Sequence, residues 1–188
     1  MHVGLYFGSF NPIHIGHLII ANHILNGGFV DKVWFVVSPQ NPLKPSNSLL
    51  NEYHRLHLVR LAINNNDQFT ASDLEFRLPK PSYTIDTLTY LSERYPQHQF
   101  SVLMGSDSYQ NGPKWKSWPT ILKHYRLLVY LRPGFDVANT PAHVTVLDAP
   151  LLQISATHIR ELIRSKKSIK YLVPETVEQE ITKERYYS

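Results

Sequence analysis

The strongest constraint on this fold is a series of short apolar runs separated by segments with helical spacing. The runs cover residues 3–7, 33–37, 69–74, 100–104, 127–131 and 144–147. Several are continuous rather than alternating, which is typical of parallel strands buried on both faces of a sheet. Between and after them, apolar spacing and turn-forming residues predict helices over 18–25, 52–64 and 83–94, a short one after 105, and two more after 155 and 174.

This alternation predicts βαβ units with right-handed crossovers. We therefore expect an α/β protein with a doubly wound, mostly parallel sheet. A length of 188 residues suits one domain, with the helical part from about 155 to 188 packed on the rest. Ligands of such sheets bind beyond the carboxyl ends of the strands, so residues 8–17, 38–44, 105–118 and 132 onward are the segments to search for chemistry.

Composition excludes some classes of protein and leaves others open. The chain has no cysteine, which rules out a disulfide scaffold, a thiolate zinc site and a cysteine nucleophile. No leader-like or membrane-length apolar segment is visible, so we expect a cytoplasmic protein without a membrane partner. The net charge of +4 suits a small polyphosphate as well as a nucleic acid, and Glu161 interrupts the main basic cluster at 160–170.

The segment from Gly8 to His17 occupies the position of a phosphate-binding turn. Small residues let a backbone approach an anion, and the following helix would direct N–H groups at it. The segment matches neither the G-x-G-x-x-G nor the Walker A pattern. His14 and His17 are three residues apart, so both would face the same anion from one side of the helix. The simpler interpretation is two surface histidines beside an ordinary turn, but their place after the first strand favours the functional one.

The sequence gives weaker support to two other kinds of site, a zinc site and a serine nucleophile. A zinc site at His14 and His17 has no third ligand spaced nearby. Gly105-Ser106-Asp107 lacks the G-x-S-x-G pattern of a serine nucleophile. Neither pattern supports a metal or a covalent mechanism.

Two distant motifs carry a resemblance to a known family. Residues 8–12 (GSFNP) with 14–17 (HIGH), and residues 154–160 (ISATHIR), resemble the paired signatures of the HIGH-motif nucleotidyltransferases. Segments at 38–44, 81–88, 105–108, 113–115 and 132–134 are similar to those of the bacterial nicotinate-mononucleotide adenylyltransferases, in the same order along nearly the whole chain. The resemblance implies a Rossmann-like nucleotidyltransferase fold.

The resemblance also implies a reaction and its partners. ATP and nicotinate mononucleotide would give nicotinate adenine dinucleotide and pyrophosphate in NAD biosynthesis, by direct attack without a covalent enzyme intermediate. Mg²⁺ would be carried by the ATP phosphates rather than held by protein ligands. No nucleic-acid partner is implied, and a homo-oligomer stays open.

The resemblance also implies which residues form the site, according to their positions in the matching motifs. The catalytic set would be His14, His17, Lys44 and Arg160. The ATP site would comprise Gly8, Ser9, Phe10, His14, His17, Gly105, Asp107, Ile154, Ser155, Thr157 and Arg160. The nicotinate mononucleotide site would comprise Ser9, Phe10, Lys44, Thr84, Trp115, Lys116 and Arg132. Simpler interpretations exist for several of these: an exposed lysine, helix-capping Asp107 and Ser155, and tryptophans that only pack.

The sequence departs from the common family pattern in three places that bear on ATP affinity. Phe7 precedes a single glycine where many members have two, Asn11 replaces a frequent aspartate, and Ala156 stands where a second serine is common. Two alternatives remain open. A phosphopantetheine adenylyltransferase-like enzyme shares both end motifs, and a non-catalytic module binding nucleotides or nucleic acid would suit the basic charge.

Overall fold

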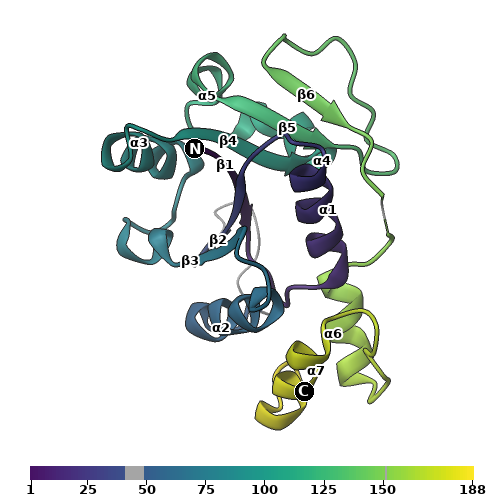
Figure 1. Ribbon diagram of the computed structural model, residues 1–188. Helices are drawn as coiled ribbons and strands as arrows, with labels where there is room; N and C mark the ends of the chain where they lie inside the picture. The colour runs from purple at the N-terminus through teal and green to yellow at the C-terminus, as the bar shows by residue number, and fades with distance from the viewer. Residues whose placement is uncertain (41–48, 151) are drawn as a thin grey trace.

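The computed structural model describes residues 1–40, 49–150 and 152–188, and within them six strands form a single sheet (Figure 1). The strands are β1 (His2–Gly8), β2 (Lys32–Val37), β3 (Phe69–Ser72), β4 (Gln99–Gly105), β5 (Arg126–Tyr130) and β6 (Val144–Leu147). The helices are α1 (Ile15–Asn26), α2 (Glu52–Ile63), α3 (Thr84–Arg94), α4 (Ser106–Gln110), α5 (Trp118–His124), α6 (Ala156–Arg164) and α7 (Glu175–Glu184), with 3-10 helices η1 (Leu74–Arg77) and η2 (Gly112–Lys114).

The strand order is β3-β2-β1-β4-β5-β6, and every pair among the described strands is parallel. The chain builds outward from β1 to β3, then crosses back to place β4 on the other side of β1. This confirms the predicted doubly wound sheet and sets its switch point between β1 and β4.

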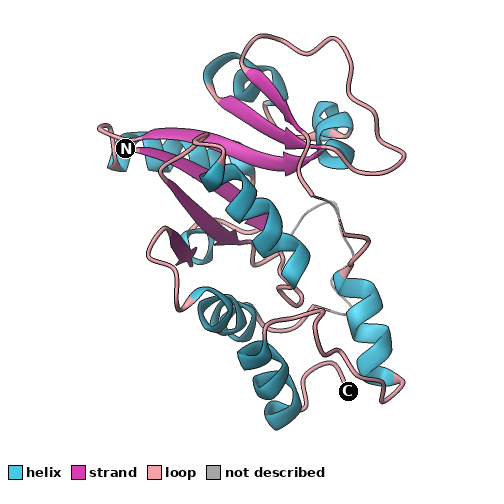
Figure 2. Ribbon diagram, turned by 45° about the vertical axis from the view of Figure 1, so that its right-hand side comes forward, coloured by secondary structure: helices cyan, strands magenta, loops and turns pink. Residues whose placement is uncertain are grey.

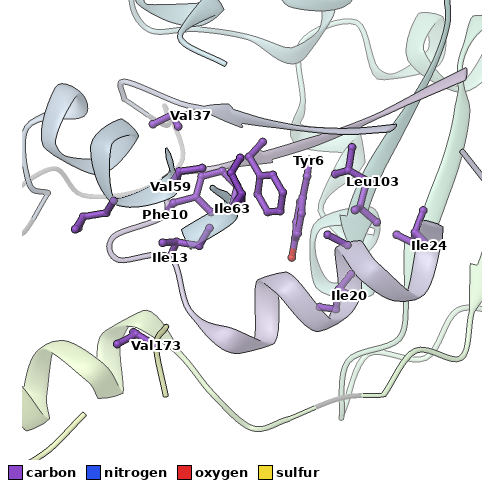
Figure 3. Close-up of a cluster of buried hydrophobic side chains, with 14 of the residues drawn as sticks. Tyr6, Phe10, Ile13, Ile20, Ile24, Val37, Val59, Ile63, Leu103 and Val173 are labelled. Carbon is purple, nitrogen blue, oxygen red and sulfur yellow. The ribbon is translucent and has the colours of Figure 1, made fainter. Parts of the chain in front are cut away.

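Alternate side chains of the central strands enter two separate cores. One core joins Leu5, Val102 and Val129 to α3 and α5. The other joins Tyr6, Leu103 and neighbouring strand residues to α1 and α2, and Figure 3 shows Tyr6 and Leu103 near Ile20 and Ile24 of α1. Because both faces of the sheet are covered, the strands read as continuous apolar runs.

The C-terminal segment packs against the core that contains α1 and α2. Figure 2 shows α6 and α7 beyond the sheet, with α7 lying beside α2. Ile159, Val177 and Ile181 are buried in that core, and the N–H of Ile15 donates to the carbonyl of Leu172 at 2.9 Å. These contacts bring the segment after 155 close to the beginning of α1.

The structure confirms the six predicted strands and the six predicted helices, and it adds elements that spacing did not predict. Helix α5 is only seven residues long, and it begins after Ser117 in a left-handed conformation (φ 55°). So short a segment holds too few turns to show periodicity, and the two 3-10 helices are shorter still. No helix within the described ranges is long and apolar enough to cross a bilayer.

Candidate active site

A cavity of about 920 Å³ lies at the carboxyl ends of the strands, with lining residues from the ends of β1, β4 and β5. Its size suits a ligand as large as a dinucleotide. The structure brings to its walls all the predicted site residues that it describes, namely Gly8, Ser9, Phe10, His14, His17, Thr84, Gly105, Asp107, Trp115, Lys116, Arg132, Ile154, Ser155, Thr157 and Arg160. Lys44 lies outside the described residues.

The turn after β1 is shaped by Gly8 and Phe10. Phe10, rather than a glycine, adopts the left-handed conformation (φ 44°), and its buried ring lies against Gly8. A Cβ on Gly8 would come 2.8 Å from that ring, so the position requires glycine. Since the Phe10 side chain is only 2% exposed, only its backbone is available to a ligand.

The two histidines of the HIGH motif form a stacked pair at the start of α1. Their ring centroids are 3.6 Å apart, and the N–H of His14 donates to Nδ1 of His17 at 3.2 Å. His14 is 6% exposed, which rules out the simpler picture of a surface residue. Burial first, and then the positive charge of Arg132, lower the pKa of His14 to about 4, so its ring is neutral near pH 7 without a ligand.

The second motif meets the first at the N-terminus of α6. Ser155 caps this helix by accepting a hydrogen bond from the N–H of His158 at 3.1 Å. Arg160 donates to the carbonyl of Asn11 at 2.7 Å and to the hydroxyl of Thr157 at 3.3 Å. The two helix N-termini therefore line the same cavity, and each carries partial positive charge toward it.

One acidic and one basic side chain meet where β4 ends. Asp107 lies 3.5 Å from Nε of Arg132, whose backbone N–H donates to the hydroxyl of Ser106 at 2.8 Å. A Cβ on Gly105 would come 2.5 Å from the carboxylate of Asp107, so that side chain would have to shift. Gly105 caps α4, so the capping role considered for Asp107 is wrong, and its carboxylate is paired with Arg132 instead.

The opposite wall carries aromatic and charged side chains. Trp115 lines the cavity and packs edge-on against Trp118 at 5.7 Å between ring centroids. Trp118 is itself buried in the core. Lys116 pairs with Asp86 at 2.8 Å and lies 4.9 Å from the ring centroid of Tyr83.

Sequence reasoning missed Arg55, which lies on α2 with no exposed surface. Its guanidinium donates to four backbone carbonyls, those of Ser9 at 2.6 Å, Ser38 at 2.8 Å, Pro39 at 3.0 Å and Leu50 at 2.7 Å. The sequence could have indicated it in one way: Arg55 stands four residues before Val59, so a charged side chain lies on the apolar face of that helix.

Sequence reasoning also missed Glu75, which is 2% exposed yet contributes to the cavity wall. It accepts hydrogen bonds from the hydroxyls of Ser82 at 2.7 Å and Thr87 at 2.9 Å. Burial raises its pKa, while bonds from Ser82, Thr87 and Ser38 oppose the rise. Its only signal was its place directly after the apolar run at 69–74.

The described part of the chain contains no group of three or more histidine, aspartate or glutamate side chains able to hold one metal ion. The cavity is instead provided with N–H donors, hydroxyls and arginines. Such a set suits the oxygen atoms of phosphates, where charge develops during phosphoryl-type transfer.

Comparison with known proteins gives consistent matches over the whole chain. A family model described as cytidylyltransferase-like matches residues 5–162. A relative from Cytophaga hutchinsonii is 53% identical over 100% of this chain and 99% of its own, and one from Flavobacterium psychrophilum is 44% identical with the same coverage. Both carry the name "Probable nicotinate-nucleotide adenylyltransferase".

Solved structures show the same fold. Plasmodium falciparum nicotinic acid mononucleotide adenylyltransferase complexed with NaAD has a TM-score of 0.85 and 22% identity, over 99% of this chain and 97% of that one. A structure of the same enzyme complexed with APC has a TM-score of 0.83, again with 22% identity, over 99% of this chain and 96% of that one. The predicted Rossmann-like nucleotidyltransferase fold is thus confirmed.

Proposed function

This chain belongs to the cytidylyltransferase-like family and, within it, to the nicotinate-nucleotide adenylyltransferases, and from this premise we propose that it joins ATP to nicotinate mononucleotide. The observation that carries the proposal is the meeting of two motifs far apart in sequence. The HIGH segment and residues 154–160 line one cavity at the switch point of the sheet. That is where a doubly wound fold binds nucleotides.

In the proposed reaction, an oxygen of the 5′-phosphate of nicotinate mononucleotide attacks the α-phosphorus of ATP. The bond from that phosphorus to the α–β bridging oxygen breaks, and pyrophosphate leaves with the electron pair. The products are nicotinate adenine dinucleotide and pyrophosphate, as needed for NAD biosynthesis. No enzyme nucleophile takes part, so alignment and charge stabilisation provide the catalysis.

The phosphate-binding roles stay with the predicted residues. His14 and His17 would donate hydrogen bonds to the phosphates from the start of α1, together with the backbone of residues 8–10. Ser155, Thr157 and Arg160 would hold the triphosphate from α6, with Gly105, Asp107 and Ile154 beside the nucleoside. Lys44 would add a cation. The donors at the starts of α1 and α6 are in place before ligand binds, which lowers the reorganisation needed in the transition state.

The acceptor would bind along the wall formed by Thr84, Trp115, Lys116 and Arg132, with Ser9 and Phe10 near its phosphate. The N-terminus of α3 would receive the pyridine carboxylate, since backbone N–H groups favour an anion. An amide in the same place turns one acceptor into a donor, so we expect a preference for the acid of at least about tenfold in kcat/KM.

Mg²⁺ enters this proposal as part of the substrate, bound to the phosphates of ATP. Its charge would add to that of the arginines and helix N-termini in neutralising the leaving pyrophosphate. The cytoplasmic location and the absence of a nucleic-acid partner stay predictions.

The two alternatives receive less support. The relatives that match over the full chain are named for nicotinate nucleotide, not phosphopantetheine. The basic cluster at 160–170 has exposed cations at positions 164, 166, 167 and 170, but the relatives that match over the full chain are named as adenylyltransferases, not as nucleic-acid-binding proteins.

The test is incubation of the protein with Mg-ATP and a panel of acceptors while pyrophosphate release is measured. Nicotinate mononucleotide should be the best acceptor, and the reaction without an acceptor should give no pyrophosphate. Pyrophosphate release with phosphopantetheine alone would favour the first alternative. Affinity for generic DNA that falls steeply with salt, without any turnover, would favour the second.

A further inference from the structure

Glu75 connects three parts of the chain under the acceptor wall of the cavity. Its Oε2 accepts from Ser82 and its Oε1 from Thr87, and Ser38 supplies a further side-chain hydrogen bond. Ser82 and Thr87 are both buried, at 7% and 0% exposure. These two residues flank Tyr83 and Thr84, so the carboxylate holds the first turn of α3 from both sides.

That first turn presents a backbone donor to the cavity. The N–H groups of Asp86 and Thr87 are already bonded to the carbonyl of Tyr83, at 3.0 and 3.3 Å. Thr84, whose N–H has no partner within a helix that begins there, lines the cavity. The direction of this N–H depends on how the turn is held, because Tyr83 caps the helix without a side-chain hydrogen bond.

The geometry of Glu75 fits holding the turn better than acting on substrate. Each carboxylate oxygen accepts a hydrogen bond from a buried hydroxyl group, which fixes the carboxylate in place and makes it a weaker base. The proposed reaction also needs no base, since the attacking phosphate oxygen is already an anion. A free carboxylate beside the pyridine acid would repel it, whereas one engaged by hydroxyl groups is partly compensated.

We propose that Glu75 is a positioning residue that sets acid-over-amide specificity, because it fixes the turn of Ser82 to Thr87 whose backbone receives the pyridine carboxylate. The inference rests on the proposed function. It predicts that loss of Glu75 weakens the acceptor site and leaves the ATP site, built on α1 and α6, largely unchanged.

The experiment compares Glu75→Ala, Glu75→Gln and wild type, with Glu93→Ala, an exposed glutamate on α3, as the matched control. Glu75→Ala should raise KM for nicotinate mononucleotide by about tenfold or more and change KM for ATP by less than about twofold. The ratio of kcat/KM for acid over amide should fall severalfold. Glu75→Gln should restore near-normal values, since an amide can accept from one hydroxyl and donate to the other. Glu93→Ala should behave as wild type.

Equal rises in both KM values, or an unchanged acid-to-amide ratio in a folded Glu75→Ala protein, would overturn the proposal. If thermal melting shows that Glu75→Ala does not fold, Ser82→Ala replaces it and should shift the same two quantities severalfold. No shift in Ser82→Ala would likewise overturn it.

Failure of the proposed function would look different. Wild type would then release no pyrophosphate with nicotinate mononucleotide. Calorimetric titration would still measure how tightly each Glu75 variant binds that nucleotide, independently of turnover. Binding weakened about tenfold in Glu75→Ala, restored in Glu75→Gln, would support the positioning role. Equal binding in all variants, or none in wild type, would count against it.

Discussion

Arg55 donates a 2.6 Å hydrogen bond to the carbonyl of Ser9, and so a buried guanidinium supports the turn that carries the HIGH motif. The same side chain bonds the carbonyls of Ser38 and Pro39 after β2. Two segments at the carboxyl ends of neighbouring strands are therefore fixed to α2. A lysine has one charged nitrogen and cannot reproduce this set of donors.

Arg55→Lys should therefore weaken both the fold and the site. We expect the free energy of unfolding to fall by about 2 kcal/mol, because carbonyls are left unpaired, and KM for ATP to rise severalfold. Urea unfolding and steady-state kinetics measure the two effects. Arg60→Lys, an exposed change on the same helix, is the control. Unchanged stability and KM in Arg55→Lys would contradict the supporting role.

His17→Ala tests charge stabilisation near the α- and β-phosphates. Loss of one donor of this kind lowers kcat on the order of 10²–10³-fold. The measurement is kcat at saturating ATP and acceptor, with His23→Ala on the last turn of α1 as the control. Near-normal turnover in His17→Ala would remove His17 from the proposed catalytic set. If chelation abolished activity even with Mg²⁺ restored, the pair would instead be binding another metal.

Arg160→Lys tests the grip on the triphosphate. The guanidinium already bridges Asn11 and Thr157 through separate nitrogens, and a single ammonium group cannot hold that fork. We expect KM for ATP to rise about tenfold. Arg164→Lys, an exposed position on the same helix, should leave it unchanged. If Arg160→Lys kept the wild-type KM and turnover, the result would contradict this role and show that Arg160 is only a surface charge.

His14 should make stability and ligand binding depend on pH. Its pKa in the folded protein is about 4, below the 6.5 of an ordinary histidine, so the unfolded chain binds the extra proton between these values. The stability that the neutral ring of His14 contributes is therefore fully present above pH 6.5 and is lost as the pH falls toward 4. The loss in the free energy of unfolding amounts to roughly 3 kcal/mol.

Two measurements check this prediction. In urea unfolding, His14→Gln should show a shallower loss of stability than wild type between pH 6.5 and 4. By NMR titration, ATP should raise the pKa of His14, since nearby phosphate charge favours the protonated ring. Parallel stability curves for the two proteins, or a pKa unchanged by ATP, would contradict a neutral, phosphate-facing His14.

The strands and main helices could be predicted because both faces of the sheet are buried, which makes runs such as 33–37 continuous and apolar. The cavity residues could be predicted because the family motifs fix their order, and a parallel sheet brings the strand ends together. The side-chain oxygen of Asn11 accepts a hydrogen bond from the N–H of Leu50 at 3.1 Å. Residue spacing could not predict this contact, because it joins two separate loops.

Arg55 and Glu75 could not be assigned from the sequence for a related reason. Each is a charged residue whose hydrogen-bond partners are backbone carbonyls or hydroxyls, so no charged partner in the sequence indicates what it contacts. Only the folded chain brings Ser9 near Arg55, or Ser82 and Thr87 around Glu75. The left-handed Phe10 is similar: that conformation is held by packing of its ring, not by a local preference.

The most direct test of the account follows the α-phosphate of ATP. With α-labelled Mg-ATP and nicotinate mononucleotide, wild type should place the label in nicotinate adenine dinucleotide, one for each pyrophosphate released. Without the acceptor it should neither label the protein nor exchange labelled pyrophosphate into ATP. Label on the protein, exchange without acceptor, or pyrophosphate release without labelled dinucleotide would contradict direct adenylyl transfer at this site.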